Sequence, residues 1–166
     1  MTNLRTPYLF ALAIFVVDQV SKFVMIGPLA LQQRGSIRLL PFFDLTWVEN
    51  RGISLGLGQA TTDTQRWLLV AVTAAIALLV AWWIRREQQS GDRFALALVL
   101  GGALGNIVDR MRLGFVVDFL DLHFGEWRPF LVFNVADAAI SIGVVILLLR
   151  ALFVRQAAPE ENIDHA

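Results

Sequence analysis

The sequence predicts a membrane α-helical protein, with four transmembrane helices and a small β-rich platform on the extracytoplasmic side. Hydrophobic residues make up 57% of the chain and its mean hydropathy is +0.62, whereas soluble domains are about 45–50% apolar. The second observation is a stretch without any charged side chain, residues 67–84. A helix that crosses a bilayer needs about 17–25 mostly apolar residues, so this stretch alone predicts one span.

Three further apolar stretches predict the other spans. The first covers residues 8–26 and is interrupted by Asp18 and Lys22. The third covers residues 94–113, and the fourth covers residues 134–153. We therefore expect a single integral membrane domain over residues 1–166.

The arrangement of the termini follows from the number of spans. Arg5 and the apolar run after it are similar to a secretory signal peptide, but no small-residue cleavage site follows, so we interpret this stretch as a retained helix. Four spans place both termini on one side. The short loop RREQQSGDR between the second and third spans carries three arginines, which favours the cytoplasm for that side. The opposite side carries seven arginines, including two at the end of the third span, so the arginine counts of the two sides are nearly balanced.

Two segments on the outer side, residues 27–66 and 114–133, connect the spans. In FFDLTWVEN the apolar residues Phe43, Leu45 and Trp47 alternate, which predicts a strand. The Gly-rich stretch NRGISLGLG is expected to turn or to pair with it, and TTDTQRW offers N-caps for the second span. The tail, residues 155–166, is expected to be disordered.

Composition and charge exclude several functional classes. Fourteen basic residues balance fourteen acidic ones, so no charge excess indicates nucleic-acid binding. The absence of cysteine excludes disulfides and thiolate catalysis. A zinc site normally needs three protein ligands, and His123 with Asp121 supplies too few. We therefore expect neither a metal nor a cofactor.

Polar and small residues within the first and third spans indicate helix packing. Asp18 and Lys22 are four residues apart and share a helix face, which predicts a structural ion pair. A catalytic dyad of Ser21 and Lys22 is disfavoured, because adjacent helical residues point about 100° apart. Gly101 and Gly105 form a GxxxG motif, which lets two helices approach closely in lipid.

Polar residues gather at the outer ends of the spans. Helix packing and an interfacial anchor explain Asp109 and Arg110 but give no reason for Asn106. Asn134 and Asp137 have the spacing of an N-cap and a capping-box acid, which explains them equally well without a function. Intramembrane ionisable groups are nevertheless functional candidates by default. The polar residues that map to this end are Asn50, Asn106, Asp109, Arg110, Asp118, Asn134 and Asp137.

Asp118 and Asp137 stand in different surroundings. Asp118 lies in the apolar run GFVVDFLDL, where burial would raise its pKa, whereas the positive end of a helix favours the charged form of Asp137. Such a pair suits acid–base catalysis, in which one carboxylate activates water and a protonated partner polarises a carbonyl. Coupled acids titrate as a pair, so the sequence leaves open which one holds the proton.

Five motifs in order resemble those of bacterial lipoprotein signal peptidase, also called signal peptidase II. They are DQVSK (18–22), NRG (50–52), GGALGNIVDR (101–110), VVDF (116–119) and FNVADAAI (133–140). The resemblance covers about residues 8–150. It implies an aspartic endopeptidase of the bacterial plasma (inner) membrane, which removes signal peptides from diacylglyceryl-modified prolipoproteins by cleaving just before the lipidated cysteine.

The resemblance also implies a role for each motif residue. Asp118 and Asp137 would be catalytic. The substrate-binding set would be Asn50, Gly52, Asn106, Arg110 and Asn134, and the structural set would be Asp18, Lys22 and Asp109. The implied partners are lipid-modified prolipoproteins, membrane lipids and globomycin-type inhibitors, with no nucleic acid, and we expect a monomer.

A lipidated cysteine keeps its acyl chains in the bilayer, so the scissile bond and both catalytic acids would lie near the headgroups. We expect the two carboxyl groups to come within reach of one bridging water. The sequence departs from the family at Glu49 and GISLG, where members commonly have an aromatic residue and GAAF. This departure concerns the groove, and hence substrate preference, more than the chemistry.

Two other interpretations remain open at this point. A small ion- or proton-coupled transporter would also need buried acids, but it requires a polar path across the membrane. The inner halves of the second and fourth spans are almost wholly apolar. A structural or lipid-binding scaffold would explain the glycines and caps, and it predicts that Asp118→Asn and Asp137→Asn have no effect.

Overall fold

The computed structural model describes residues 4–52 and 62–153. Four of its helices are long and apolar enough to cross a membrane, which confirms the predicted membrane α-helical class. Their bounds are α1 Arg5–Ile26, α3 Asp63–Arg86, α4 Ser90–Arg112 and α5 Val135–Phe153. At about 1.5 Å per residue, each is close to the roughly 30 Å thickness of a bilayer's hydrocarbon core.

Two helices begin before the apolar stretches that predict them, and in both a side chain bonds the backbone near the helix start. The Thr62 hydroxyl accepts a hydrogen bond from the backbone N–H of Gln65 at 3.3 Å, and the Gln65 side chain accepts one from the Thr62 N–H at 3.2 Å. This capping box starts α3 at Asp63, which confirms the predicted N-cap. Helix α4 begins at Ser90, and Arg93 in its first turn donates from Nε to the carbonyl of Glu87 at 2.6 Å.

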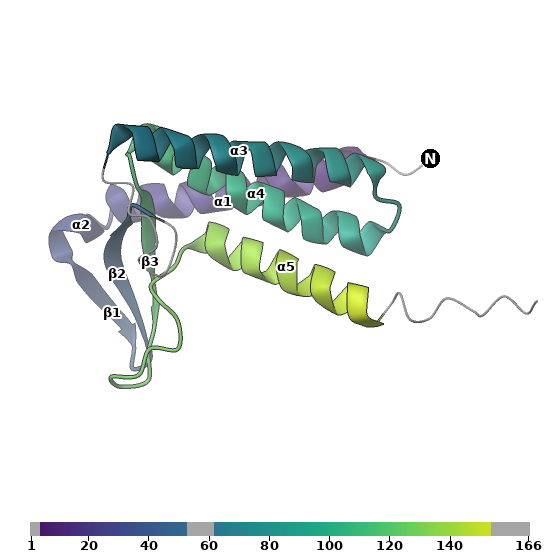
Figure 1. The fold of residues 1–166 in the computed structure, drawn as a ribbon. Helices are drawn as coiled ribbons and strands as arrows, with labels where there is room; N and C mark the ends of the chain where they lie inside the picture. The colour runs from purple at the N-terminus through teal and green to yellow at the C-terminus, as the bar shows by residue number, and fades with distance from the viewer. Residues whose placement is uncertain (1–3, 53–61, 154–166) are drawn as a thin grey trace, which may run out of the picture.

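Helix α4 packs against α1, α3 and α5, as Figure 1 shows. Its glycines make these contacts possible. A Cβ at Gly101 would overlap the backbone carbonyl of Ala11 in α1, and a Cβ at Gly102 would overlap that of Ala136 in α5. The close helix packing predicted from the GxxxG motif is therefore confirmed.

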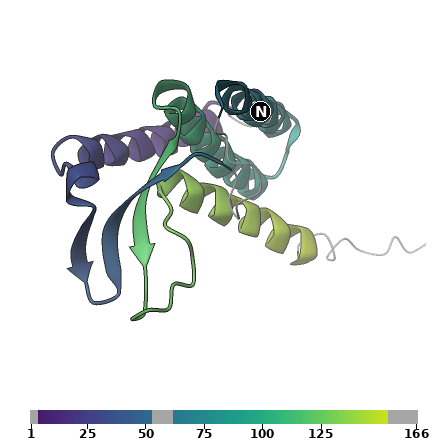
Figure 2. The ribbon, with the colours of Figure 1, turned by 60° about the vertical axis from the view of Figure 1, so that its left-hand side comes forward.

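A three-stranded antiparallel sheet covers one end of the four helices (Figures 1 and 2). Its order is β1-β2-β3, with bounds β1 Ser36–Leu40, β2 Phe43–Asn50 and β3 Val116–Leu122. A short helix, α2 Leu31–Arg34, precedes it. The predicted strand is β2, and its neighbours are β1 and β3. Residues 53–58 of the Gly-rich stretch and the predicted disordered tail lie outside the described residues.

The pairing around β3 brings the chain back beside Asp118. Strand β2 has one extra residue between Leu45, which pairs with Leu120, and Val48, which pairs with Asp118. Such bulges re-aim side chains and are frequent near active sites. On the other edge of β3, Phe133 pairs with Leu120. The next residue, Asn134, therefore arrives next to Asp118.

Candidate active site

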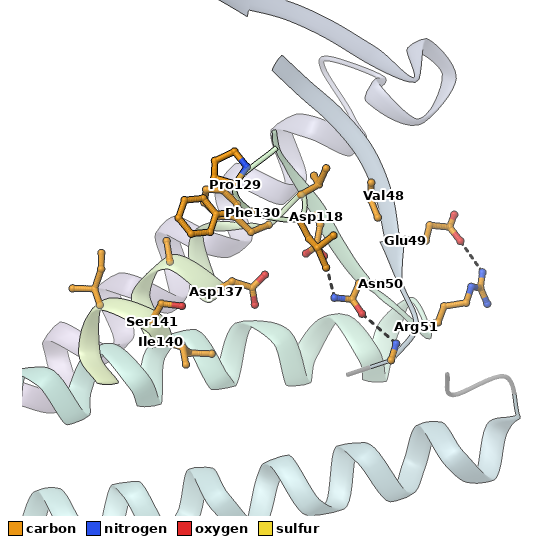
Figure 3. Close-up of a pocket in the computed structure, with 16 residues that line it drawn as sticks. Val48, Glu49, Asn50, Arg51, Asp118, Pro129, Phe130, Asp137, Ile140 and Ser141 are labelled. Carbon is orange, nitrogen blue, oxygen red and sulfur yellow. Dashed lines mark hydrogen bonds and ion pairs between the residues drawn. The ribbon is translucent and has the colours of Figure 1, made fainter. Parts of the chain in front are cut away.

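Asp118 lies on β3 and its side chain is almost completely buried, with 2% of the residue exposed. Its Oδ1 accepts a hydrogen bond from Asn134 Nδ2 at 2.6 Å, and its Oδ2 accepts one from Asn50 Nδ2 at 3.1 Å. Figure 3 shows the bond from Asn50. Both carboxyl oxygens are thus held by side-chain amides, from the end of β2 and from the segment before α5.

The surroundings of Asp118 change its proton affinity. Burial is the main cause and the negative charge of Asp137 the second cause that together raise the pKa of Asp118 from 3.8 to about 7. The hydrogen bonds from Asn50 and Asn134 and the charge of Lys22 oppose this rise. Burial dominates, because the charged form loses more solvation than two amide donors return. The expectation of a raised pKa is confirmed.

Asp137 lies in the first turn of α5, and Asn134 caps that helix. The backbone N–H of Asp137 donates to Asn134 Oδ1 at 2.9 Å, and the backbone N–H of Asn134 donates to Asp137 Oδ2 at 3.3 Å. This reciprocal pair is the capping box that the spacing predicts. Asn106 Nδ2 donates to the other oxygen of Asp137 at 2.8 Å. These hydrogen bonds fix the orientation of the Asp137 carboxylate. Its part in the helix cap therefore does not exclude a part in chemistry.

Both aspartates line one cavity of about 960 Å³, a size suited to ligand binding. Figure 3 shows Asp118 and Asp137 facing the same open space from β3 and from α5. Most of the other residues that line the cavity are apolar. These other residues are Val48, Glu49, Asn50, Arg51, Gly52, Pro129, Phe130, Leu131, Val132, Phe133, Ala138, Ile140, Ser141 and Ile142. The cavity thus follows α5 from its first turn into the membrane-spanning part.

The predicted substrate-binding residues fall into two groups. Asn50 and Gly52 line the cavity, and Asn50 Oδ1 accepts the backbone N–H of Gly52 at 3.2 Å. Asn106, Asn134 and Arg110 do not line it. Asn106 donates to Asp137, and Asn134 donates to Asp118. Arg110 Nη2 donates to the carbonyl of Gly52 at 3.3 Å. A direct substrate contact from these three residues stays a prediction.

Asp18, Lys22 and Asp109 form a buried ionic cluster behind the cavity, which we call the Lys22 cluster. The Lys22 ammonium lies 2.8 Å from Asp18 Oδ2 and 2.7 Å from Asp109 Oδ2, and all three residues are almost fully buried. The predicted Asp18–Lys22 ion pair is confirmed. Ser21 donates instead to the carbonyl of Asp18 at 2.7 Å.

The side chain of Gln19 binds two members of the Lys22 cluster, a contact that the sequence interpretation did not predict. Its Nε2 donates to Asp109 Oδ1 at 2.9 Å, to Asp18 Oδ2 at 3.2 Å and to the carbonyl of Gly105 at 3.3 Å. The available signal was its position inside DQVSK, as an uncharged polar residue within a span. Its amide supplies donors to carboxylates that a single lysine leaves partly unsatisfied.

Two other acids of the outer segments, Asp44 and Asp121, bind side chains elsewhere in the sheet. Asp121 accepts from Arg128 Nε at 3.1 Å and from Thr46 Oγ1 at 3.1 Å, and His123 Nε2 lies 3.3 Å from Asp44 Oδ2. No group of three His, Cys, Asp or Glu side chains suited to a metal occurs among the described residues. The acids that line the cavity are Asp118, Asp137 and Glu49, and the Glu49 carboxylate is paired with Arg51 at 2.7 Å.

Comparison with known protein families identifies one model that matches residues 10–153, and it describes signal peptidase II. Several curated relatives carry the name lipoprotein signal peptidase. The protein of Rhizorhabdus wittichii is 58% identical over 165 residues, covering 98% of this chain and 96% of the relative. The protein of Sphingopyxis alaskensis is 56% identical, with the same coverage. That of Methylorubrum extorquens is 43% identical over 163 residues, covering 98% and 95%.

Two solved structures of bacterial membrane enzymes, determined by the in meso method, have the same fold. The first, at 2.3 Å resolution, is 28% identical, with a TM-score of 0.79 over 94% of this chain and 92% of that chain. The second, at 1.9 Å resolution, is also 28% identical, with a TM-score of 0.75 over 89% and 93%. These likenesses extend over the helices and the sheet together.

Proposed function

Because the chain belongs to the signal peptidase II family, we propose that Asp118 and Asp137 are the catalytic pair with which it hydrolyses its substrates. The protein is a multi-pass membrane aspartic endopeptidase that removes signal peptides from prolipoproteins. The transporter interpretation has no support from the family comparisons. The observation that carries the assignment of the pair is that both carboxyl groups line the same cavity.

The different surroundings of the two acids support different roles. Asp118, with a pKa of about 7, retains a proton near neutral pH and polarises the scissile carbonyl. Asp137, held as an acceptor by Asn106 and by the Asn134 backbone, removes a proton from the attacking water. Water oxygen bonds to the carbonyl carbon, the C–N bond breaks, and the leaving amine takes up a proton. The products are a carboxylic acid and an amine.

The position of the cavity supports a substrate that keeps a lipid in the membrane. Asp137 is in the first turn of a membrane-spanning helix, and the sheet covers that end of the bundle (Figure 1). The cavity that Asp118 and Asp137 line also has exposed apolar side chains in its wall, among them Phe130, Leu131 and Ile142. A cysteine anchored by diacylglycerol would present the peptide bond before it at this depth. Globomycin-type inhibitors would compete for the same cavity, and bilayer lipids would border it.

The orientation that we propose places this cavity on the extracytoplasmic side of the inner membrane. The beginning of α1 and the end of α5 both lie at the helix ends opposite the sheet (Figure 1). The loop between α3 and α4 lies there too, with Arg85, Arg86 and Arg93 close to it, which is typical of a cytoplasmic side. One chain supplies both acids, so we propose that the monomer is active.

Cleavage by aspartate variants tests the proposal. Purified Asp118→Asn and Asp137→Asn, reconstituted in lipid, should each lose turnover of a diacylated prolipoprotein by at least about a thousandfold, as expected when one partner of an acid–base pair is removed. Asp121→Asn is the matched control, because Asp121 is a buried acid of the same strand outside the cavity. Normal cleavage by either of the first two variants would rule out the pair.

A further inference from the structure

The Lys22 cluster touches the backbone directly before each catalytic aspartate. Asp18 Oδ1 accepts a hydrogen bond from the backbone N–H of Ala136 at 2.9 Å, one residue before Asp137. Asp109 Oδ2 accepts one from the backbone N–H of Val117 at 3.3 Å, one residue before Asp118. Lys22 bridges Asp18 and Asp109, so a single ammonium group connects the two attachment points.

The same ammonium group also orients Asn106. Lys22 Nζ donates to Asn106 Oδ1 at 3.1 Å, and Asn134 Nδ2 donates to that oxygen at 3.3 Å. Two donors at one oxygen fix which end of the amide is which. The Nδ2 end therefore points toward Asp137, to which it donates at 2.8 Å.

These contacts require a specific packing between α1 and α4. The Lys22 cluster draws its residues from both helices, and its hydrogen bonds reach α5 and β3. Gly105 makes room for it, since a Cβ there would overlap Asp18 Oδ2. None of the three cluster residues lines the cavity. Their effect on the reaction must therefore pass through other groups.

We propose that the Lys22 cluster is a positioning device that fixes the separation of Asp118 and Asp137, with Lys22 acting on Asp137 through Asn106. This inference rests on the proposed function and deepens the structural role that the family resemblance implies for the three residues. Lys22, Asp18 and Asp109 are positioning residues, because they act through backbone amides and an asparagine. A simple structural pair would hold helices together without controlling the geometry of the acids.

Lys22→Met tests the proposal, because it keeps the apolar stem and removes the donor. Turnover of a diacylated prolipoprotein in proteoliposomes should fall about 100-fold or more, the effect expected from a displacement of roughly 1 Å at a catalytic group. KM should stay within about threefold, because the cavity wall is unchanged. Lys22→Arg retains the cation and should recover part of the turnover. Arg93→Met is the control, since Arg93, on α4, is also a buried cation and donates to the backbone carbonyl of Glu87 away from the cavity.

A compensated variant separates positioning from charge balance. Lys22→Met with Asp109→Asn removes one positive and one negative charge, so the cluster keeps its net charge. Thermal stability should return part of the way toward that of the parent, because one buried carboxylate instead of two is left without the ammonium group. Turnover should stay low, because the ammonium bridge and the bond to Asn106 are still missing. Recovery of both stability and turnover would overturn the inference.

The pH profile and a double variant provide two further measurements. The groups whose charges act on Asp118 are Asp137 and Lys22, with Arg110 nearby. Removing the positive charge of Lys22 should move the high-pH fall of kcat/KM upward, a change that loose helix packing alone would not cause. Asn106→Leu combined with Lys22→Met should lose no more turnover than the worse single variant. Fully additive losses would contradict action through Asn106.

The outcomes distinguish this inference from the proposed function. If Asp118→Asn and Asp137→Asn are inactive while Lys22→Met keeps the parent kcat, the catalytic pair stands and the positioning role is wrong. If the two aspartate variants cleave normally, the catalytic pair is wrong whatever Lys22→Met does.

Discussion

Asn134 binds Asp118 with a 2.6 Å hydrogen bond from its side-chain amide, while its side-chain oxygen caps α5, the helix that carries Asp137 in its first turn. One fully buried asparagine thus connects the two acids. The connection explains why a helix cap and a catalytic site occupy the same few residues. Removing both polar groups of the Asn134 side chain should therefore alter the stability of α5 and the geometry of Asp118 together.

Substitution of Asn134 can separate these two effects. Asn134→Ser keeps a good N-cap but shortens the side chain, so it should retain stability and lose turnover by about tenfold, roughly the contribution of one hydrogen bond. Asn134→Ala should lose turnover and, in addition, about 1 kcal/mol of stability with the cap. Cleavage assays and thermal denaturation measure the two effects. Equal stability of the two variants would contradict the capping role.

The pH dependence of cleavage follows from the raised pKa of Asp118. The folded protein holds this proton up to about pH 7, whereas an unperturbed carboxyl group loses it near 3.8. The protonated form acts as the acid, so kcat/KM should fall as pH rises through about 7. The same proton contributes stability that is complete below pH 3.8 and is lost as pH rises through about 7.

Asn50→Ala should move that high-pH fall to higher pH. Asn50 donates to Asp118 Oδ2 at 3.1 Å and lowers the pKa of that carboxyl group, so its removal leaves the charged form less stabilised. Asp121→Asn should leave the position of the fall unchanged. If the high-pH fall of kcat/KM in Asn50→Ala stays at the same pH or moves to lower pH, a group other than Asp118 controls that fall.

Gly105→Ala should disturb the site from within α4. The added methyl group would overlap Asp18 Oδ2, so the Asp18 carboxylate must shift. This shift weakens both the ion pair of Oδ2 with Lys22 and the hydrogen bond that Oδ1 accepts from the Ala136 N–H. We expect a loss of about 1–3 kcal/mol in stability, typical of overpacking, together with reduced turnover. Leu104→Ala is the comparison, because Leu104 is 38% exposed beside the same position. Parent-like melting and turnover in Gly105→Ala would contradict the tight packing.

Ser141→Trp should obstruct the part of the cavity that follows α5. Ser141 lines the wall one turn beyond Asp137 (Figure 3), so a large side chain there should raise KM about tenfold while the pH profile is retained. Val145→Trp places the same side chain on an exposed part of α5 outside the cavity and should have little effect. Equal KM values in the two variants would indicate that substrate does not use this part of the cavity.

The sequence predicts the spans well because membrane helices require long apolar runs. It predicts their ends less well, since capping by Thr62 and the bond from Arg93 to Glu87 extend helices into polar sequence. Strand β3 is harder to recognise than β2. Val116 to Phe119 are all buried, so β3 lacks the alternation that identifies a half-exposed strand.

The sequence predicts which polar residues belong to the site, but it does not predict most of the contacts between them. Asp137 and Asn134 are close in sequence, so their capping box could be predicted from spacing. The bonds from Ala136 to Asp18 and from Val117 to Asp109 involve backbone amides, which leave no signature in side-chain identity. The pairing of Phe133 with Leu120, which places Asn134 beside Asp118, likewise depends on tertiary structure.

The most direct measurement of the central claim is a single-turnover cleavage of a diacylated prolipoprotein in ¹⁸O-labelled water, with mass analysis of both products. If Asp118 and Asp137 activate water for direct attack, one ¹⁸O atom appears in the new carboxyl group of the released signal peptide. No covalent adduct of the protein should accumulate, and Asp118→Asn and Asp137→Asn should give no product. An acyl-enzyme adduct, or labelled product formed at the parent rate by either variant, would contradict the account.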